Sequence, residues 1–149
     1  MKKTPNAQRP TPNIEWGGGH VAEMPNGTYG NRRKYDLEER LLNFTASVVR
    51  LADSLPNTKA GNHIAGQLLR SGTSPLANHG EVEAAESRKD FLHKLRICLK
   101  ELRETWRWLR LVCRLELSHG DQLRTTLTEV EELIRIFAAS VRTTEKNAK

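Results

Sequence analysis

The amino-acid sequence predicts an all-α protein: an antiparallel up-and-down four-helix bundle that follows a disordered, basic N-terminal tail. Two observations favour this fold class. The composition is 28% charged, 37% hydrophobic and only 5% aromatic, which suits helices with solvated faces better than a sheet rich in Val, Tyr and Phe. Apolar residues also recur at intervals of three and four, the period of an amphipathic helix. A chain of 149 residues predicts one domain with one core.

Residues 1–34 form the predicted tail. They hold four of the six prolines and the run Gly17–Gly19, and they show no apolar period, a pattern typical of disorder. Six Lys and Arg against two Asp and Glu give this segment a net charge of +4. Its basic end, Arg32–Lys34, could reach a phosphate backbone, or the tail could be a plain solubilising arm.

The bundle is predicted over residues 35–145, and its first helix over residues 36–54. Asp36 and Glu39 have the spacing of a capping box at the start of this helix, and Pro56 follows its end. One stripe of apolar residues runs along it with spacings of four and three: Leu37, Leu41, Phe44, Val48, Leu51 and Leu55.

The second helix is predicted over residues 58–86, with Thr58 as its N-cap. The cluster Ser71–Pro75 predicts a kink near residues 72–75. A third helix is predicted over 88–114 behind a capping box at Ser87 and Asp90, and a fourth over 119–143. Short connections between helices join antiparallel neighbours. The apolar stripe of the fourth helix comprises Leu123, Leu127, Val130, Ile134, Phe137 and Val141.

The third predicted helix carries nine Lys and Arg against three Asp and Glu. Its apolar stripe faces the core, with Trp106 at the edge, and its cations lie on the opposite side, within roughly 40° of one line over about 27 Å. Glu104, four residues after Lys100, offsets only part of this charge. Because like charges at these spacings repel, the row predicts a polyanionic ligand, with RNA or DNA favoured. The predicted nucleic-acid-binding residues are Arg96, Lys100, Arg103, Arg107, Arg110 and Arg114.

A further sector of the same helix is apolar, and a single bundle has no core left to bury it. It comprises Ile97, Trp108 and Leu111, and an uncovered patch containing Trp predicts an interface between copies of the chain. Incidental exposure is the alternative.

The sequence predicts no enzymatic activity, no cofactor and no metal site. Glu116 and His119 have the spacing of half a di-iron site, but the second pair that such a site needs is missing. Cys98 and Cys113 lie about 22 Å apart on one helix, too far to form a disulfide, and both are expected to be buried. The sequence shows no membrane-spanning run and no apolar stretch after Met1, which predicts a cytoplasmic protein.

Several segments together, in this order, resemble one known family. They are Leu55–Thr58, Gln67–Ser74, Ala77–Glu81, Ser87–Leu102 and Glu132–Thr143. They are similar to the four-helix-bundle protein family, also called the 23S rRNA intervening-sequence protein family, over roughly residues 35–145. The chain departs from that family at Pro75–Leu76, where many relatives have a β-branched residue followed by Gly or Pro, and residues 1–34 have no counterpart.

The resemblance implies an up-and-down bundle that assembles as a ring, typically a pentamer, without enzymatic activity. One related branch, the accessory variability determinant of diversity-generating retroelements, is a basic barrel that binds nucleic acid and a reverse transcriptase. The hypothesis is therefore a homo-oligomeric bundle that binds RNA or DNA, with a reverse transcriptase or another nucleoprotein as a partner. The alternative is a structural scaffold without a nucleic-acid ligand, whose cations pair with Glu129, Glu131 and Glu132 of a neighbouring subunit.

Overall fold

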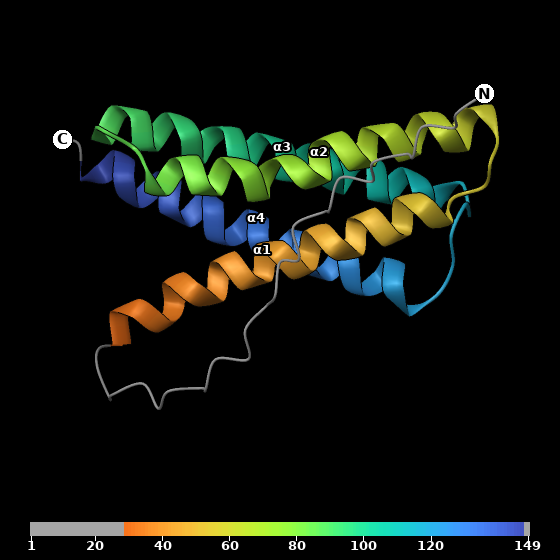
Figure 1. Cartoon of the computed structure of the whole chain (residues 1–149), viewed down its shortest axis with the longest axis horizontal. Coiled ribbons are helices and arrows are strands. Elements are labelled where there is room, and N and C mark those ends of the chain that lie inside the picture. The colour runs from red at the N-terminus through yellow and green to blue at the C-terminus, as the bar shows by residue number, and fades with distance from the viewer. Residues whose placement is uncertain (1–28, 148–149) are drawn as a thin grey trace, which may run out of the picture.

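The computed structural model describes the backbone of residues 29–147 and the side chains of residues 37–147. Four long helices make up almost all of this part: α1 (Tyr29–Ser54), α2 (Lys59–Glu83), α3 (Arg88–Arg114) and α4 (Asp121–Lys146). They run side by side along the long axis of the molecule (Figure 1). The predicted all-α four-helix fold is confirmed.

Each helix packs along the helix that follows it in the chain, and α1 closes the bundle against α4. Within the described residues the diagonal pairs, α1 with α3 and α2 with α4, do not approach each other closely. This neighbour-to-neighbour arrangement is the up-and-down topology expected from the short connections. Of the four helix pairs in contact, α1 and α4 have the least extensive contact.

Helix α1 begins at Tyr29, seven residues before the predicted start at residue 36. Asp36 therefore lies inside the helix and not at its N-cap, so the predicted capping box is wrong. Arg and Lys are good helix formers, and no proline stands between Pro25 and Pro56, so the helix can extend through Arg32–Lys34. Residues 29–34 of the predicted tail are thus helical, and residues 1–28 lie outside the described part.

Helix α2 begins as predicted at the Thr58 cap, whose hydroxyl oxygen accepts a hydrogen bond from the Gly61 backbone N–H at 3.0 Å. It continues through the buried Pro75 to Glu83, three residues short of the predicted end. The Ser71–Pro75 cluster does not interrupt the helix. Instead, the hydroxyls of Ser71 and Thr73 donate back to carbonyls one turn earlier, at 2.9 and 2.7 Å.

Helix α3 spans the predicted residues, and its N-cap is confirmed, because the Ser87 hydroxyl oxygen accepts from the Asp90 N–H at 3.1 Å. In a capping box the Asp90 carboxylate would accept a hydrogen bond from the Ser87 backbone N–H. Here it accepts instead from the N–H of the preceding residue, Glu86, at 3.4 Å. Helix α4 starts two residues later and ends three residues later than predicted. It follows Gly120, whose φ of 103° is accessible to glycine without strain.

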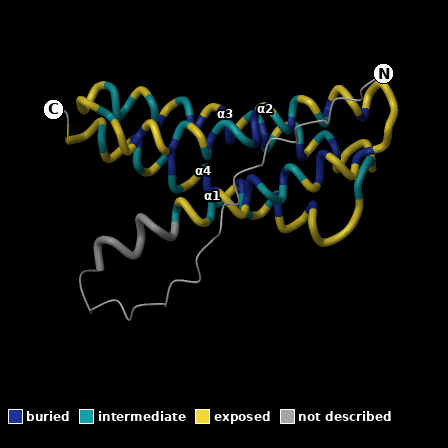
Figure 2. The backbone as a smooth tube through the Cα atoms, in the orientation of Figure 1, coloured by how far each residue is buried: buried dark blue, intermediate teal, exposed yellow. Residues whose placement is uncertain are grey.

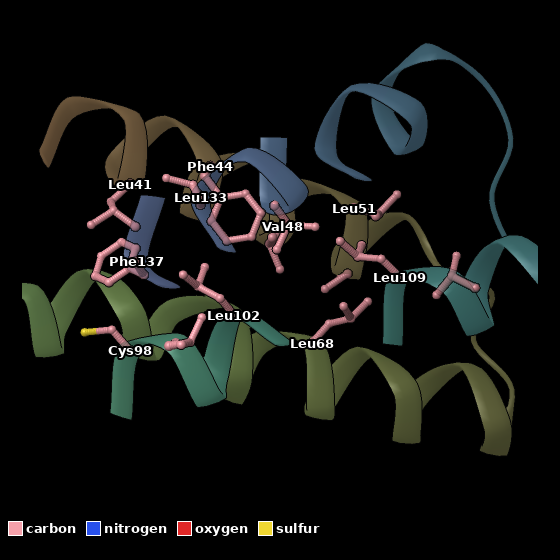
Figure 3. Packing of buried hydrophobic residues seen from close by; sticks show 14 of the residues in the cluster. Leu41, Phe44, Val48, Leu51, Leu68, Cys98, Leu102, Leu109, Leu133 and Phe137 are labelled. Carbon is pink, nitrogen blue, oxygen red and sulfur yellow. The ribbon is translucent and has the colours of Figure 1, made fainter. Parts of the chain in front are cut away.

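The core runs the length of the bundle between the four helices. Buried residues lie on the inner side of each helix and exposed residues on the outer side (Figure 2). Every helix contributes (Figure 3). The residues labelled there are Leu41, Phe44, Val48, Leu51, Leu68, Cys98, Leu102, Leu109, Leu133 and Phe137. The predicted stripes supply most of these side chains, but the fully buried Leu133 of α4 lies outside its predicted stripe.

Candidate nucleic-acid interface

The six predicted cations of α3 lie on its solvent side, and all six are exposed. We call this row the ridge: Arg96, Lys100, Arg103, Arg107, Arg110 and Arg114. The helix places them there because its other side is required by the core, where Leu95, Cys98, Leu102, Leu109 and Val112 are buried. Because α3 is uninterrupted, its 3.6 residues per turn align the six cations along one side, as predicted.

Arg96 pairs with a carboxylate, and the other five members of the ridge have no such partner among the described residues. Its Nη2 atom lies 2.6 Å from Glu145 Oε1 of α4, and both side chains are largely exposed, so the pair contributes little to stability. Across residues 37–147, no carboxylate oxygen lies within 4.0 Å of a charged nitrogen of the remaining five. The ridge therefore presents five uncompensated positive charges to solvent.

Two members of the ridge make other contacts. Arg107 Nη1 donates to the backbone carbonyl of Arg103 at 3.3 Å. The Arg110 guanidinium lies over the Trp106 ring, 4.4 Å from its centroid, at a distance typical of a cation–π contact. Neither contact neutralises the cation.

Two of the three acidic residues of α3, Glu101 and Glu104, pair with α2 and not with the ridge. Arg70 of α2 pairs with Glu104 and, at 3.5 Å, with Glu101. Glu104 also accepts a hydrogen bond from Trp108 Nε1 at 3.4 Å. By spacing, Glu104 could partly offset Lys100, but its carboxylate is engaged on the other edge of the helix.

On the opposite flank, a groove separates the ridge from α4. Trp106 Nε1 donates to Glu131 Oε1 at 3.1 Å across this groove. The lining residues are Arg103, Trp106, Arg107, Glu131, Ile134 and Arg135. The helical period of α3 predicts that Trp106 lies at the core edge, but it cannot predict the groove, because only packing sets the register of α4 against α3.

The acidic residues of α4 are engaged within the chain. Glu129 accepts two hydrogen bonds from the Arg40 guanidinium of α1, at 2.9 and 3.1 Å. Glu132 pairs with Arg135, and Glu131 accepts from Trp106. The acidic surface that could have received the ridge of a neighbouring subunit is therefore largely occupied.

The predicted interface residues Ile97, Trp108 and Leu111 are half-buried. Trp108 and Leu111 pack against the core, and the Trp108 ring meets His63 of α2 edge-on, with 6.1 Å between centroids. The prediction that a single bundle leaves this sector uncovered is thus wrong for these two residues, because both pack against the core and Trp108 also contacts α2. Their use as an interface between copies stays a prediction.

The two cysteines differ from each other in burial. Cys98 is buried, as predicted, and its burial raises the pKa of the thiol to about 11. Cys113 is exposed, so its predicted burial is wrong. It lies in the last turn of α3, next to the fully buried Val112.

The described residues include neither a cluster of metal-ligand side chains nor a membrane-spanning helix. No three His, Cys, Asp or Glu side chains gather there as metal ligands would. Of the four helices, none combines the length and the low charge needed to cross a lipid bilayer.

Four long helices in up-and-down order, with one strongly basic outer face, place the molecule among the small helical bundle proteins. The chain belongs to the 23S rRNA-intervening sequence protein family, whose family model matches residues 33–139. This confirms the resemblance found in the sequence.

A crystal structure of a protein from Bacteroides thetaiotaomicron VPI-5482 is similar to this chain. That protein is described as one of unknown function from the S23 ribosomal protein family. The two are 35% identical with a TM-score of 0.65, and the match covers 70% of this chain and 97% of the other. Comparison with curated proteins gives no match.

Proposed function

We propose that this protein is a non-enzymatic, homo-oligomeric bundle that binds RNA or DNA through the ridge. One observation carries the proposal: five exposed cations follow one another along α3 with no carboxylate of the described residues within 4.0 Å. Like charges three and four residues apart destabilise a helix. A phosphate backbone relieves this repulsion, and it releases counterions when the cations neutralise it.

A linear phosphate backbone suits this surface. Five of the six ridge residues are arginines, whose planar guanidinium can donate two parallel hydrogen bonds to a phosphate. The repeated charges also extend in one line, as phosphates do along a strand. These features support a linear polyanion without requiring sequence-specific contacts.

Self-association is the second part of the proposal. Ile97, Trp108 and Leu111 keep part of their apolar surface exposed, and the family resemblance supports a ring, with a pentamer as the expected form. A ring would bring several ridges onto one nucleic acid and raise the apparent affinity without any new contact. From the same resemblance we include a reverse transcriptase or another nucleoprotein as a partner, and a cytoplasmic location.

One observation favours the alternative, a scaffold without a nucleic-acid ligand. Arg96 already pairs with Glu145 of α4, so the ridge accepts carboxylates within the chain and could accept them from a neighbouring subunit. In that case the ridge would hold the oligomer together, and raising the salt concentration would dissociate it.

The test is a charge reversal with a matched control. The ridge variant carries Arg103→Glu, Arg107→Glu and Arg110→Glu, and the control carries Arg50→Glu, Lys59→Glu and Arg88→Glu, three exposed cations outside the ridge. Each triple change lowers the formal net charge from +6 to 0, because three reversals remove six charges. Fluorescence anisotropy with labelled RNA and DNA then measures the affinity of each variant.

We expect the ridge variant to lose at least about 100-fold in affinity while the control retains most of it. Equal losses would assign binding to net charge and overturn the role of the ridge. For five or six phosphate contacts, the wild-type affinity should fall by a factor on the order of 10² to 10³ between 50 and 200 mM salt. Light scattering on the same samples separates the alternatives, because an oligomer that only the ridge variant disrupts would support the scaffold.

A further inference from the structure

We infer that the preferred ligand is a single strand, of which one unpaired base enters the groove between α3 and α4 and stacks on Trp106 while neighbouring phosphates lie on Arg103 and Arg107. This inference rests on the proposed function and narrows it. The ridge by itself would bind duplexes and single strands alike. The groove beside it adds an aromatic surface that only an unpaired base can use.

The groove combines apolar and cationic groups in a way that suits a nucleotide. Its volume is about 410 Å³, within the range of small-ligand sites. Trp106 and Ile134, both half-buried, supply apolar surface, and Arg103 and Arg107 on the α3 side belong to the ridge. A ligand that fills the groove therefore remains in reach of the uncompensated charges.

The Trp106 ring is held in place before any ligand binds. Its Nε1 donates to Glu131 at 3.1 Å, and Arg110 lies against the ring, 4.4 Å from the centroid. A ring fixed in this way loses little conformational entropy when a base stacks on it. Arg110 links the stacking surface to the ridge, because the same side chain contacts the indole and carries a ridge charge.

The charges around the groove favour different positions for a base and for a phosphate. Glu131 lines the groove, and its carboxylate would repel a phosphate there. Arg135, also in the lining, is paired with Glu132, so it attracts an anion less than the unpaired Arg103 and Arg107 do. Phosphates therefore belong on the α3 side of the groove, and the uncharged base belongs inside it.

Stacking on an aromatic side chain changes affinity by about 5- to 150-fold per base and tolerates any base sequence. In a duplex each base is already stacked and paired, so Trp106 cannot reach its face without unpairing it. The groove thus predicts that the protein prefers single strands to duplexes. The size of this preference should depend on Trp106.

The experiment compares Trp106→Leu with Trp106→Phe. Both substitutions remove the hydrogen bond to Glu131, but only phenylalanine keeps an aromatic face. Anisotropy measures affinity for a single-stranded RNA, a single-stranded DNA of the same sequence, duplexes of both, and a DNA strand with abasic sites. Circular dichroism verifies that each variant keeps its helicity.

We expect Trp106→Leu to lose about 10-fold or more in affinity for single strands and little for duplexes, and Trp106→Phe to retain most of it. Wild-type protein should bind the abasic strand more weakly than the intact strand, a difference that Trp106→Leu removes. The RNA and DNA arms show which single strand is preferred.

Three results would overturn the inference: equal single-strand affinity in wild type and Trp106→Leu, equal losses for single strand and duplex, or equal wild-type binding of intact and abasic strands. The last comparison needs no variant, so it decides the matter even if Trp106→Leu fails to fold. If Trp106 has no effect while the ridge variant loses binding, the proposed function stands and only the groove is excluded. A wild-type protein that binds no nucleic acid would refute both.

Discussion

The charged side chains on the two edges of α3 differ in whether they have partners of opposite charge. On the edge that faces α2, Arg70 lies between Glu101 and Glu104 and pairs with both. On the ridge, only Arg96 has a carboxylate partner among the described residues. The bundle therefore compensates charges where two helices meet and leaves them uncompensated where α3 faces solvent. We conclude that the inner side of α3 serves folding and that the ridge is available for a partner.

The largest effect should come from the buried side of α3. Leu102→Ala removes a fully buried side chain and leaves a cavity between the helices, so the free energy of unfolding should fall by about 2–5 kcal/mol. Lys100→Ala, two residues away on the exposed ridge, should change it by less than about 0.5 kcal/mol. Urea unfolding followed by circular dichroism measures both, and similar losses would erase the contrast between the two sides.

A smaller effect is expected where α2 approaches α1. A Cβ atom added at Gly72 would lie 2.5 Å from Val48 Cγ1, so Gly72→Ala should reduce the free energy of unfolding by about 1–3 kcal/mol. Gly66 of the same helix has open space around it, and Gly66→Ala should increase stability by up to about 1 kcal/mol. Thermal unfolding of both variants tests this, and a stabilised Gly72→Ala would show that the helices can separate freely there.

The sequence predicted the fold well because the information for it is local. Stripes of apolar residues, the caps at Thr58 and Ser87, and Pro56 after the first helix are all readable within a few turns of chain. The start of α1 was missed because Asp36 and Glu39 form a capping pattern that also fits inside a helix, and no residue before them stops it. The end of α2 was overestimated by three residues for the same reason, since Ala84 and Ala85 are compatible with helix.

In the candidate site, the ridge could be predicted from the sequence and the groove could not. The ridge lies on one helix, so its alignment follows from helical geometry alone. The groove beside it depends on which residues of α4 face Trp106, and neither Glu131 nor Arg135 signals this in the sequence. The exposure of Cys113 likewise depends on how the other helices pack against the last turn of α3.

The comparison between the two edges can be tested directly by removing one arginine from each. Arg70→Ala leaves Glu101 and Glu104 without their cation, and we expect a loss of about 1 kcal/mol, reduced by the exposure of Arg70. Arg103→Ala removes a cation from a row of like charges and should leave stability unchanged or raise it by a few tenths of a kcal/mol. Urea unfolding at low and high salt separates them, and equal losses would show that the ridge also contributes to folding.

The last prediction concerns the buried Cys98 and appears only at high pH. Burial raises the pKa of this thiol from 9.0 to about 11, so between these values the unfolded chain loses the proton before the folded protein does. Stability should therefore fall as the pH rises from 9 to 11 and level off above that window. The unfolding midpoints of wild type and Cys98→Ala at pH 8 and 10.5 measure this contribution, with Cys113→Ala as the control. An identical pH dependence in all three would contradict it.

The uninterrupted course of α3 has a consequence for stoichiometry. Because the helix runs without a break from Arg88 to Arg114, the ridge is a straight element of fixed length, about 27 Å at 1.5 Å per residue. Along the axis of a duplex, each strand carries one phosphate per about 3.4 Å, so the ridge is as long as about eight base pairs of a duplex. If the ridge binds nucleic acid as proposed, the length that one subunit occludes is therefore limited by the length of α3.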